Sequence, residues 1–218
     1  MLGAPGAGKG TQAQRIARDH GLPHISTGDI FRKHLKEGTD LGKQVQDYLN
    51  SGALVPDELT CAIVADRLVE PDCANGYILD GFPRSQAQAE ALDAFLSKQG
   101  DRIDAAIDID VPDEEIVERL GARRSCPVCG AVYNLRFSPP KGDDRHCDRE
   151  GCGAELTLRD DDKPDTIRQR LNVYKETTKP IRAFYDERGL LRSIPAAGLP
   201  PDDVYAEVEE VLDSLGGL

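Results

Sequence analysis

A glycine-rich run near the start of the chain has the residue types that bind phosphate. Residues 3–11 read GAPGAGKGT. Glycines let backbone N–H groups curl around an anion, and Lys9 adds a positive charge for the outer phosphates. A helix expected from Gly8 to His20 would direct the positive end of its dipole at the same place. The run therefore predicts a nucleotide phosphate site rather than an ordinary glycine-rich turn.

One position of this run departs from the general phosphate-loop pattern. The pattern has Ser or Thr directly after the lysine, where the hydroxyl holds Mg²⁺. Here Gly10 takes that place and Thr11 follows one residue later. We therefore expect a bound Mg²⁺ ion to depend more on the nucleotide, on water and on acidic residues elsewhere.

A second segment with chemical potential is Asp-Gly-Phe-Pro-Arg at 80–84. It follows a short buried strand expected at 77–79, and ligands of open α/β sheets lie at the carboxyl ends of strands. Asp80 could order Mg²⁺-bound water there, and Arg84 could grip a phosphate with two hydrogen bonds. The segment 26–29, Ser-Thr-Gly-Asp, adds a hydroxyl and a carboxylate; its alternative interpretation is a helix N-cap.

The arginines form the next candidate group. We expect a helix from Pro112 to about Arg124 with Arg119, Arg123 and Arg124 on its last turns, and a long helix that begins near Arg168 and Arg170. Pairing with surface acids is the alternative role, and it fits Arg124 and Arg168. Phosphoryl transfer spreads negative charge over several oxygens, which several cations must offset. The cations predicted to do so are Lys9, Arg32, Arg84, Arg123, Arg159 and Arg170.

Two cysteine clusters have the form of paired zinc knuckles. The cysteines are Cys126, Cys129, Cys147 and Cys152. Four thiolates would close a tetrahedral site, so the zinc would be structural and would hold a small β-rich flap that has little core of its own. The second pair is spaced more widely than usual, which leaves the fourth ligand open. The side chains that could compete for that position are His146, Asp148 and Glu150, and free buried thiols are the alternative to any metal.

Composition limits the classes of partner. The 218 residues contain 27 Lys and Arg against 39 Asp and Glu, a net charge of −12, which disfavours nucleic acid and anionic membranes as partners. Mean hydropathy is −0.46, and no apolar run approaches the length that spans a bilayer. Since the phosphate loop begins at residue 3, we expect no secretory leader and a cytoplasmic protein.

Strand and helix patterns alternate along most of the chain. Strands are expected at 22–26, 77–79, 105–111 and 190–194, and Met1-Leu2 should be the end of a further strand that leads into the loop. Helices are expected at 8–20, 29–37, 41–51, 57–70, 85–99, 112–124, 166–188 with a bend at Pro180, and 201–215. This alternation predicts a parallel sheet with helices on both faces. Short β-like pieces rich in Cys, Gly and Pro interrupt it from 125 to 158.

Taken together, these motifs resemble the adenylate kinases, which interconvert ATP plus AMP and two ADP. The resemblance covers essentially the whole chain, with the motifs in family order. The matching segments are 6–11, 26–29, 52–57 (GALVPD), 80–84, 123–124 and 159–162 (RDDD). It implies an α/β P-loop kinase with a central parallel five-stranded sheet. It also implies a core of 1–25, 56–121 and 163–218, a helical AMP-binding insert at 26–55, and a zinc-binding lid at 122–162.

The resemblance further implies roles by position. ATP would be bound by Gly6, Ala7, Gly8, Lys9, Gly10, Thr11, Arg119, Val132, Tyr133 and Gly198. AMP would be bound by Thr27, Arg32, Ala53, Leu54, Val55, Gly81, Phe82, Pro83, Arg84, Gln88, Arg159 and Arg170. The catalytic group would be Lys9, Asp80, Arg84, Arg123, Arg159 and Arg170, with Mg²⁺ brought by ATP and ordered by Asp80 and Asp29. No residue would act as a covalent nucleophile, and the protein would be a monomer.

The start of the chain departs from the family pattern. Family members have a strand of several apolar residues before the loop, and only Met1 and Leu2 stand here. Each missing buried Val, Ile or Leu would contribute about 1.5–3 kcal/mol, and a whole domain is stable by about 5–15 kcal/mol. We therefore expect the natural chain to start upstream.

Three other functions are weighed against this one. The nearest is another nucleoside monophosphate kinase, with UMP or CMP as acceptor or GTP as donor; the zinc-type lid disfavours the UMP/CMP kinases. A P-loop switch without phosphoryl transfer would lack the second site that Arg32 and 80–84 indicate. A zinc-ribbon nucleic-acid binder is disfavoured by the acidic residues of the ribbon region.

Overall fold

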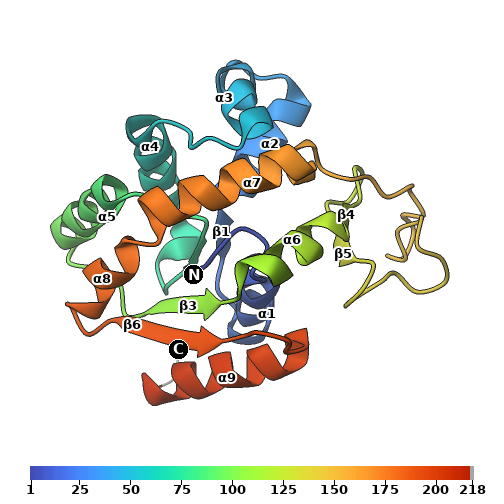
Figure 1. Ribbon diagram of the computed structural model, residues 1–218. Helices are drawn as coiled ribbons and strands as arrows, with labels where there is room; N and C mark the ends of the chain where they lie inside the picture. The colour runs from blue at the N-terminus through green and yellow to red at the C-terminus, as the bar shows by residue number, and fades with distance from the viewer. Residues whose placement is uncertain (217–218) are drawn as a thin grey trace.

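The computed structural model describes residues 1–216, which form an α/β fold (Figure 1). The elements are α1 (Lys9–His20), β1 (His24–Ser26), α2 (Thr27–Glu37), α3 (Asp40–Ser51), α4 (Asp57–Leu68), a 3₁₀ turn (Pro71–Cys73), β2 (Ile78–Asp80), α5 (Gln86–Gln99), β3 (Ala106–Asp110), α6 (Asp113–Gly121), β4 (Arg123–Ser125), β5 (Val132–Asn134), a 3₁₀ turn (Asp160–Asp162), α7 (Pro164–Val173), a π turn (Tyr174–Thr178), α8 (Ile181–Asp186), β6 (Leu191–Pro195) and α9 (Pro201–Ser214).

The central layer consists of two pairs of parallel strands. β1 pairs with β2, with Ser26 opposite Asp80, and β3 pairs with β6. Met1 and Leu2 lie between the pairs: the Met1 amino group donates to the Leu79 carbonyl at 2.7 Å, and Leu2 forms a parallel bridge with Asp108. The predicted parallel sheet is confirmed, with the expected first strand present as this single bridge.

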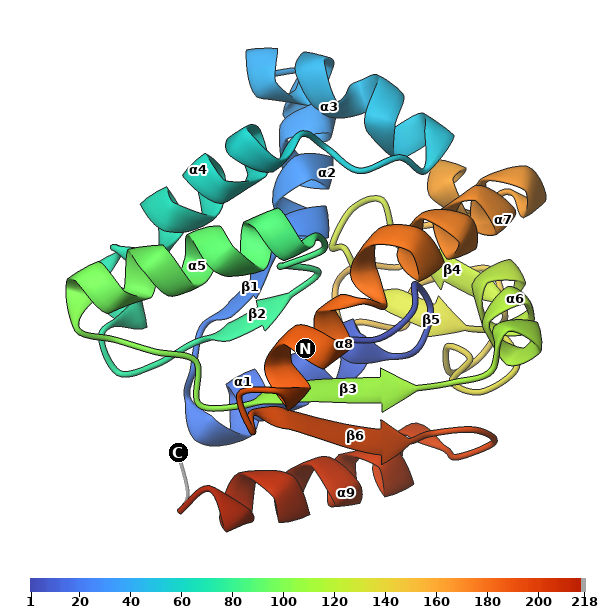
Figure 2. The same cartoon turned by 60° about the vertical axis from the view of Figure 1, so that its left-hand side comes forward.

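Alternation along β3 explains why helices cover both faces of the layer. Ile107 and Ile109 are buried with Ile16 of α1 and Val208 of α9, whereas Ala106 packs on the other side with Ile181 of α8. Successive side chains of a strand point to opposite faces, so an apolar run such as this one needs cover on both. Figure 2 shows α9 on one side of β3 and β6 and α8 on the other.

One expected helix is shorter than predicted, and this changes the setting of two arginines. α6 ends at Gly121, so the prediction that Arg123 and Arg124 lie on its last turns is wrong. Both belong to β4, which pairs antiparallel with β5, Arg124 opposite Tyr133. The backbone from Ala122 to Ser125 bonds to lid residues, including Ser125 to Thr157, and these bonds replace the helical ones.

The expected long helix at 166–188 is interrupted. It begins earlier, at Pro164, whose fixed φ suits a first helical turn. After Val173 the backbone takes a π turn, in which the Lys179 N–H bonds to the Tyr174 carbonyl, and α8 follows Pro180. Since proline has no N–H to donate, the regular helix cannot continue through residue 180.

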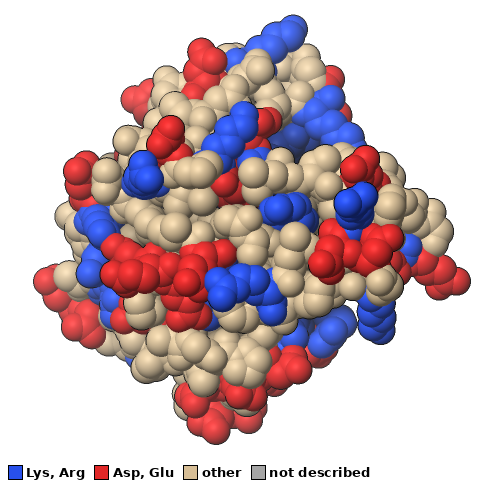
Figure 3. Space-filling view, turned by 45° about the vertical axis from the view of Figure 1, so that its right-hand side comes forward, with Lys and Arg blue, Asp and Glu red and all other residues tan. Residues whose placement is uncertain are grey.

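The surface is mixed in charge. On the face drawn in Figure 3, acidic groups gather in several places, with Lys and Arg between them. Among residues 1–216, no helix has both the length and the apolar character that crossing a membrane requires.

A buried charge on β3 was not anticipated from the sequence. Asp108 is fully buried, and Arg182 of α8 forms an ion pair with its Oδ2 at 3.1 Å. Burial raises the pKa of the Asp108 carboxyl, against the opposing charge of Arg182. This pair ties α8 to the central strand.

Arg182→Met should leave Asp108 without its counter-charge and destabilise the fold by about 2 kcal/mol, less than for a fully buried pair because the Arg182 side chain is partly exposed. A raised pKa favours the protonated form of the native state, so the loss should be larger at pH 8 than at pH 5. Chemical unfolding at both pH values measures it, with Arg182→Lys as the charge-conserving control. An equal loss at both pH values would contradict this account.

Candidate functional site

A single cavity of about 1050 Å³ brings most of the predicted site residues together. It runs between the phosphate loop, the end of β2, the segment 26–55 and the lid. The predicted residues that line it are Gly6, Ala7, Gly8, Lys9, Gly10, Thr11, Thr27, Asp29, Arg32, Ala53, Leu54, Val55, Asp80, Gly81, Pro83, Arg84, Gln88, Arg119, Arg123, Val132, Tyr133, Arg159 and Arg170.

The lining is strongly cationic. Eleven Lys and Arg side chains line the cavity, against three Asp and no Glu. The whole chain carries a net charge of −12, so this excess is local. A cleft lined by one sign of charge raises the local concentration of ligands of the opposite sign. The cavity is therefore suited to anions such as nucleotide phosphates.

The glycine-rich run forms a tight loop that leads directly into α1. Gly6 has φ +86°, and a Cβ there would lie 2.7 Å from the Leu120 side chain, so only glycine fits without strain. Lys9 begins α1, and its Nζ donates to the carbonyls of Gly3 and Ala4 at 2.9 and 2.8 Å. Burial lowers the pKa of Lys9 to about 8, although the charge of Asp80 opposes the shift.

Asp80 stands directly beside the loop. A Cβ on Gly10 would lie 3.1 Å from Asp80 Oδ2, so the carboxylate occupies the space next to the position where the general pattern has a hydroxyl. Burial by itself would raise the pKa of the Asp80 carboxyl, but a hydrogen bond from His24 and the charge of Lys9 lower it to about 2. Asp80 is therefore an ionised oxygen ligand of the kind that Mg²⁺ and its bound water prefer.

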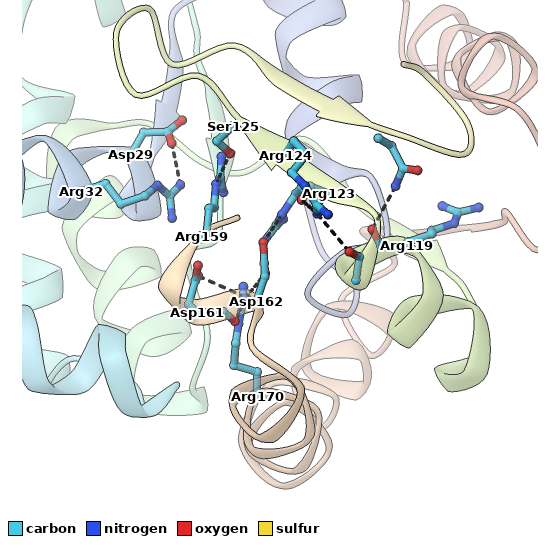
Figure 4. A network of polar contacts seen from close by, with 12 residues as sticks. Asp29, Arg32, Arg119, Arg123, Arg124, Ser125, Arg159, Asp161, Asp162 and Arg170 are labelled. Carbon is cyan, nitrogen blue, oxygen red and sulfur yellow. Dashed lines mark hydrogen bonds and ion pairs between the residues drawn. The ribbon is translucent and has the colours of Figure 1, made fainter. Parts of the chain in front are cut away.

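Four arginines from four parts of the chain converge beside the loop (Figure 4). Arg123 Nε and Nη2 bond to the two oxygens of Asp162 at 2.6 and 2.5 Å, and Arg170 bonds to the same carboxylate at 3.0 Å. Arg159 donates to Ser125 Oγ at 2.7 Å, and Arg32 to Asp29 at 2.5 Å.

The cations are held close enough to affect one another. Burial, together with the charges of Arg32 and Arg123, lowers the pKa of Arg159 to about 9. Burial likewise lowers the pKa of Arg84 to about 10, with Arg170 adding to the shift. These groups remain protonated at neutral pH, and an anion bound among them would relieve their mutual repulsion.

The end of the cavity beside β2 is a set of interlocked polar groups. The Gly81 carbonyl accepts from Thr27 Oγ1 at 2.8 Å and from Arg84 Nε at 2.7 Å. Gln88 accepts from the Arg84 backbone N–H and donates to Asp57 Oδ1, both at 2.7 Å. Rotamers fixed in this way preorganise a site for a second ligand.

At the opposite end, Arg119 is held by Glu115 at 2.5 Å and by the carbonyls of Ala7 and Ala196. Its guanidinium lies 5.7 Å from the centre of the Phe137 ring. Phe137 is half exposed and lines the cavity, where its aromatic ring could stack on a base, and it was not singled out from the sequence.

Two of the predicted nucleotide-binding residues do not line the cavity. Phe82 is 2 % exposed and packs in the core with Ile25 and Leu92. Gly198 lies near the Arg119 end, where its N–H donates to the Glu115 carboxylate at 3.0 Å.

The two units over the cavity touch each other. Lys36 Nζ, at the end of α2, donates to the Pro127 carbonyl in the first cysteine knuckle at 2.7 Å. Both residues line the cavity. The segment 26–55 and the lid are therefore in contact across it.

The four predicted cysteines form one cluster in the lid. Their Sγ atoms all lie within 4.8 Å of one another, with Cys126 and Cys152 at 3.5 Å and Cys129 and Cys147 also at 3.5 Å. A tetrahedral zinc with Zn–S distances of about 2.3 Å separates its sulfurs by about 3.8 Å, so the cluster fits this metal. The competing His146 instead bonds to Asp143.

The knuckle backbone also prepares the thiolate form. Burial would raise the pKa of Cys126, but backbone hydrogen bonds from Cys129 and Val128 lower it to about 6. Tyr133 Oη lies 3.1 Å from Cys147 Sγ and donates to Asp148 at 2.7 Å, as groups around a metal site often do. The tyrosine thus links the cluster to the cavity that it lines.

The fold and the cavity define a P-loop nucleotide kinase, in which a phosphate loop at a strand end faces convergent arginines. The sequence model of the family described as adenylate kinase matches residues 1–190. Proteins named adenylate kinase from Agathobacter rectalis and Archaeoglobus fulgidus are 54% and 49% identical to this chain, over 97% and 99% of its length and 97% of theirs. The chain belongs to the adenylate kinase family.

The cysteine cluster gives a prediction for metal removal. Cys152→Ser should lower the bound zinc, from about one per chain, because a hydroxyl is a poor zinc ligand. Loss of the metal should destabilise the protein by about 2 kcal/mol, which corresponds to roughly 4–8 °C in Tm.

Metal analysis and calorimetry test this, with Cys61→Ser in α4 as the control that should keep its zinc. Full zinc content in Cys152→Ser would show that this cysteine is not a ligand.

Proposed function

We propose that this protein transfers the terminal phosphoryl group of Mg-ATP reversibly to AMP and so forms two ADP. The observation that carries the proposal is the cavity itself, where a phosphate loop at one end and the polar set around Gly81 at the other face the same arginines. A cavity of this form suits two nucleotides whose phosphates meet between the two ends. Membership of the adenylate kinase family supports the same reaction.

In this proposal the phosphate loop binds the donor. Backbone N–H groups of 6–11 and Lys9 hold the ATP phosphates, Arg119 and Phe137 flank the adenine, and Val132 and Tyr133 complete the lid side. The acceptor AMP lies against Thr27, 53–55, Gly81 and Gln88, with Arg32 and Arg84 on its phosphate. The preformed bonds among these groups support this assignment, because they fix the donors before a ligand arrives.

The catalytic group then acts by charge and position. Arg123 and Arg159 lie in the lid and Arg170 lies on α7 (Figure 4). The charges of Arg123 and Arg170 reach Lys9, so these cations would meet the charge that develops on the transferred phosphoryl group. Mg²⁺ bound with ATP would neutralise charge on the bridging phosphate oxygens, and Asp80 would accept hydrogen bonds from its water ligands. No group of the chain needs to form a covalent intermediate.

The contact between Lys36 and Pro127 supports a closed arrangement of the AMP insert and the lid over the reactants. We infer that these two units, 26–55 and 122–162, move to admit nucleotides and close to exclude water. Exclusion matters because water would otherwise accept the phosphoryl group. A monomeric, cytoplasmic protein stays a prediction of the sequence.

The reaction is tested with ADP and Mg²⁺ as the sole substrates, by coupling ATP formation to a dye-linked reaction. ADP fills both nucleotide sites, so turnover establishes the proposed reaction. Forward assays with AMP, CMP, UMP and GMP as acceptors, and with ATP or GTP as donor, then separate this activity from that of other monophosphate kinases. Nucleotide binding without any turnover would instead support a P-loop switch.

Removal of one arginine from the acceptor end should have a large effect. Arg84→Ala deletes a half-buried cation that the proposal places on the AMP phosphate, and we expect kcat to fall about 10²–10³-fold. Arg102→Ala is the matched control, since the Arg102 side chain is exposed and its one ion pair within residues 1–216 is with Asp104 at the surface. Steady-state kinetics on folded proteins measure both, and an unchanged kcat in Arg84→Ala would remove this residue from the proposed group.

A further inference from the structure

We propose that His24 is a positioning residue that fixes the Asp80 carboxylate for the magnesium-bound nucleotide. The inference rests on the role of Asp80 in the proposed function. His24 Nε2 lies 3.2 Å from Asp80 Oδ2, and both side chains are nearly buried, at 13% and 12% exposed. His24 was not among the residues predicted from the sequence, since its neighbours there are a proline and an apolar strand.

The sheet register places the two residues on one face. His24 is opposite Ile78 and Ser26 is opposite Asp80, so His24 and Asp80 are diagonal neighbours on paired parallel strands. Diagonal neighbours on one face are within reach of long side chains. Asp80 lines the cavity and His24 does not, so the imidazole supports the carboxylate from behind and does not touch the nucleotide.

The two carboxylate oxygens therefore have different surroundings. Oδ2 accepts from His24 and lies against Gly10 at the start of α1. Within residues 1–216, Oδ1 accepts no side-chain or backbone hydrogen bond, and it is not among the fully enclosed atoms. Oδ1 is thus the oxygen that can accept from a water molecule on Mg²⁺.

The different surroundings of Oδ1 and Oδ2 depend on the hydrogen that the His24 imidazole donates to Oδ2. An ionised carboxylate can only accept hydrogen bonds, so His24 Nε2, which faces it, must carry a hydrogen. Neutral imidazole supplies this proton, and no change in charge is required. Without it, Oδ2 would lose a partner and the carboxylate could rotate toward Lys9, whose positive charge already acts on it. Groups that orient metal-binding side chains in this way typically change metal affinity or activity 10–100-fold when removed.

The test compares three variants of the full-length protein. His24→Leu removes the donor and keeps an apolar side chain of moderate size. His24→Gln keeps an N–H donor that can reach the same oxygen. Asp80→Asn removes the carboxylate charge itself. The readouts are the Mg²⁺ concentration for half-maximal rate at saturating nucleotide, kcat, KM for AMP, and Tm.

We expect His24→Leu to raise the Mg²⁺ concentration for half-maximal rate about tenfold and to lower kcat about tenfold. KM for AMP should stay within about twofold of that of the unsubstituted protein. His24→Gln should restore both to within about threefold, since it keeps the donor. The double variant His24→Leu/Asp80→Asn should be no worse than Asp80→Asn, because both changes act through one carboxylate.

Two results would overturn the inference, and they are distinguishable. An altered Mg²⁺ requirement in Asp80→Asn with a normal one in His24→Leu would leave the role of Asp80 intact and reject that of His24. A normal requirement in Asp80→Asn would reject the role of Asp80 on which the inference rests. A lower Tm in His24→Leu with normal kinetics would assign His24 to stability alone, which also rejects the proposal.

Discussion

The concentration of positive charge in one partly enclosed cavity is the constraint on which the rest of the structure depends. Water cannot solvate these cations fully, and the chain supplies only a few acids to balance them. Asp162 accepts from Arg123 and Arg170 at once and has almost no exposed surface, so it anchors the lid strand and α7 to each other. Removal of Asp162 would leave both arginines without this counter-charge. The cavity nevertheless retains an excess of positive charge that suits an anion.

The sequence was most informative for short motifs whose conformation is set by residues adjacent in the chain. Residues 6–11 and the four cysteines could be interpreted from spacing alone, because a phosphate loop and a thiolate cluster are built largely from neighbours in the chain. The alternation of strands and helices likewise predicted the parallel sheet. These features depend on local backbone conformation and on periodicity, both of which a sequence displays directly.

The structural settings that could not be predicted from the sequence depend on contacts between residues far apart in the chain. Arg123 fits a helical pattern by its neighbours, and only the bonds between 122–125 and distant lid residues make it part of a strand. His24 and Asp108 are ordinary residues in sequence, and their significance comes from partners 56 and 74 positions away. Phe82 lies in a motif of cavity residues, yet it turns into the core because the motif must also be attached to the sheet.

The bond from Lys36 to Pro127 has a consequence for how the two nucleotides affect each other. It joins the unit that is proposed to cover the acceptor to the unit that is proposed to cover the donor. If either unit swings outward, the bond is lost, so the closed position of one favours the closed position of the other. Binding at one end then strengthens binding at the other by the same factor in both directions. The enzyme would in this way retain a complete pair of substrates longer than a single one, and an unpaired nucleotide would leave quickly.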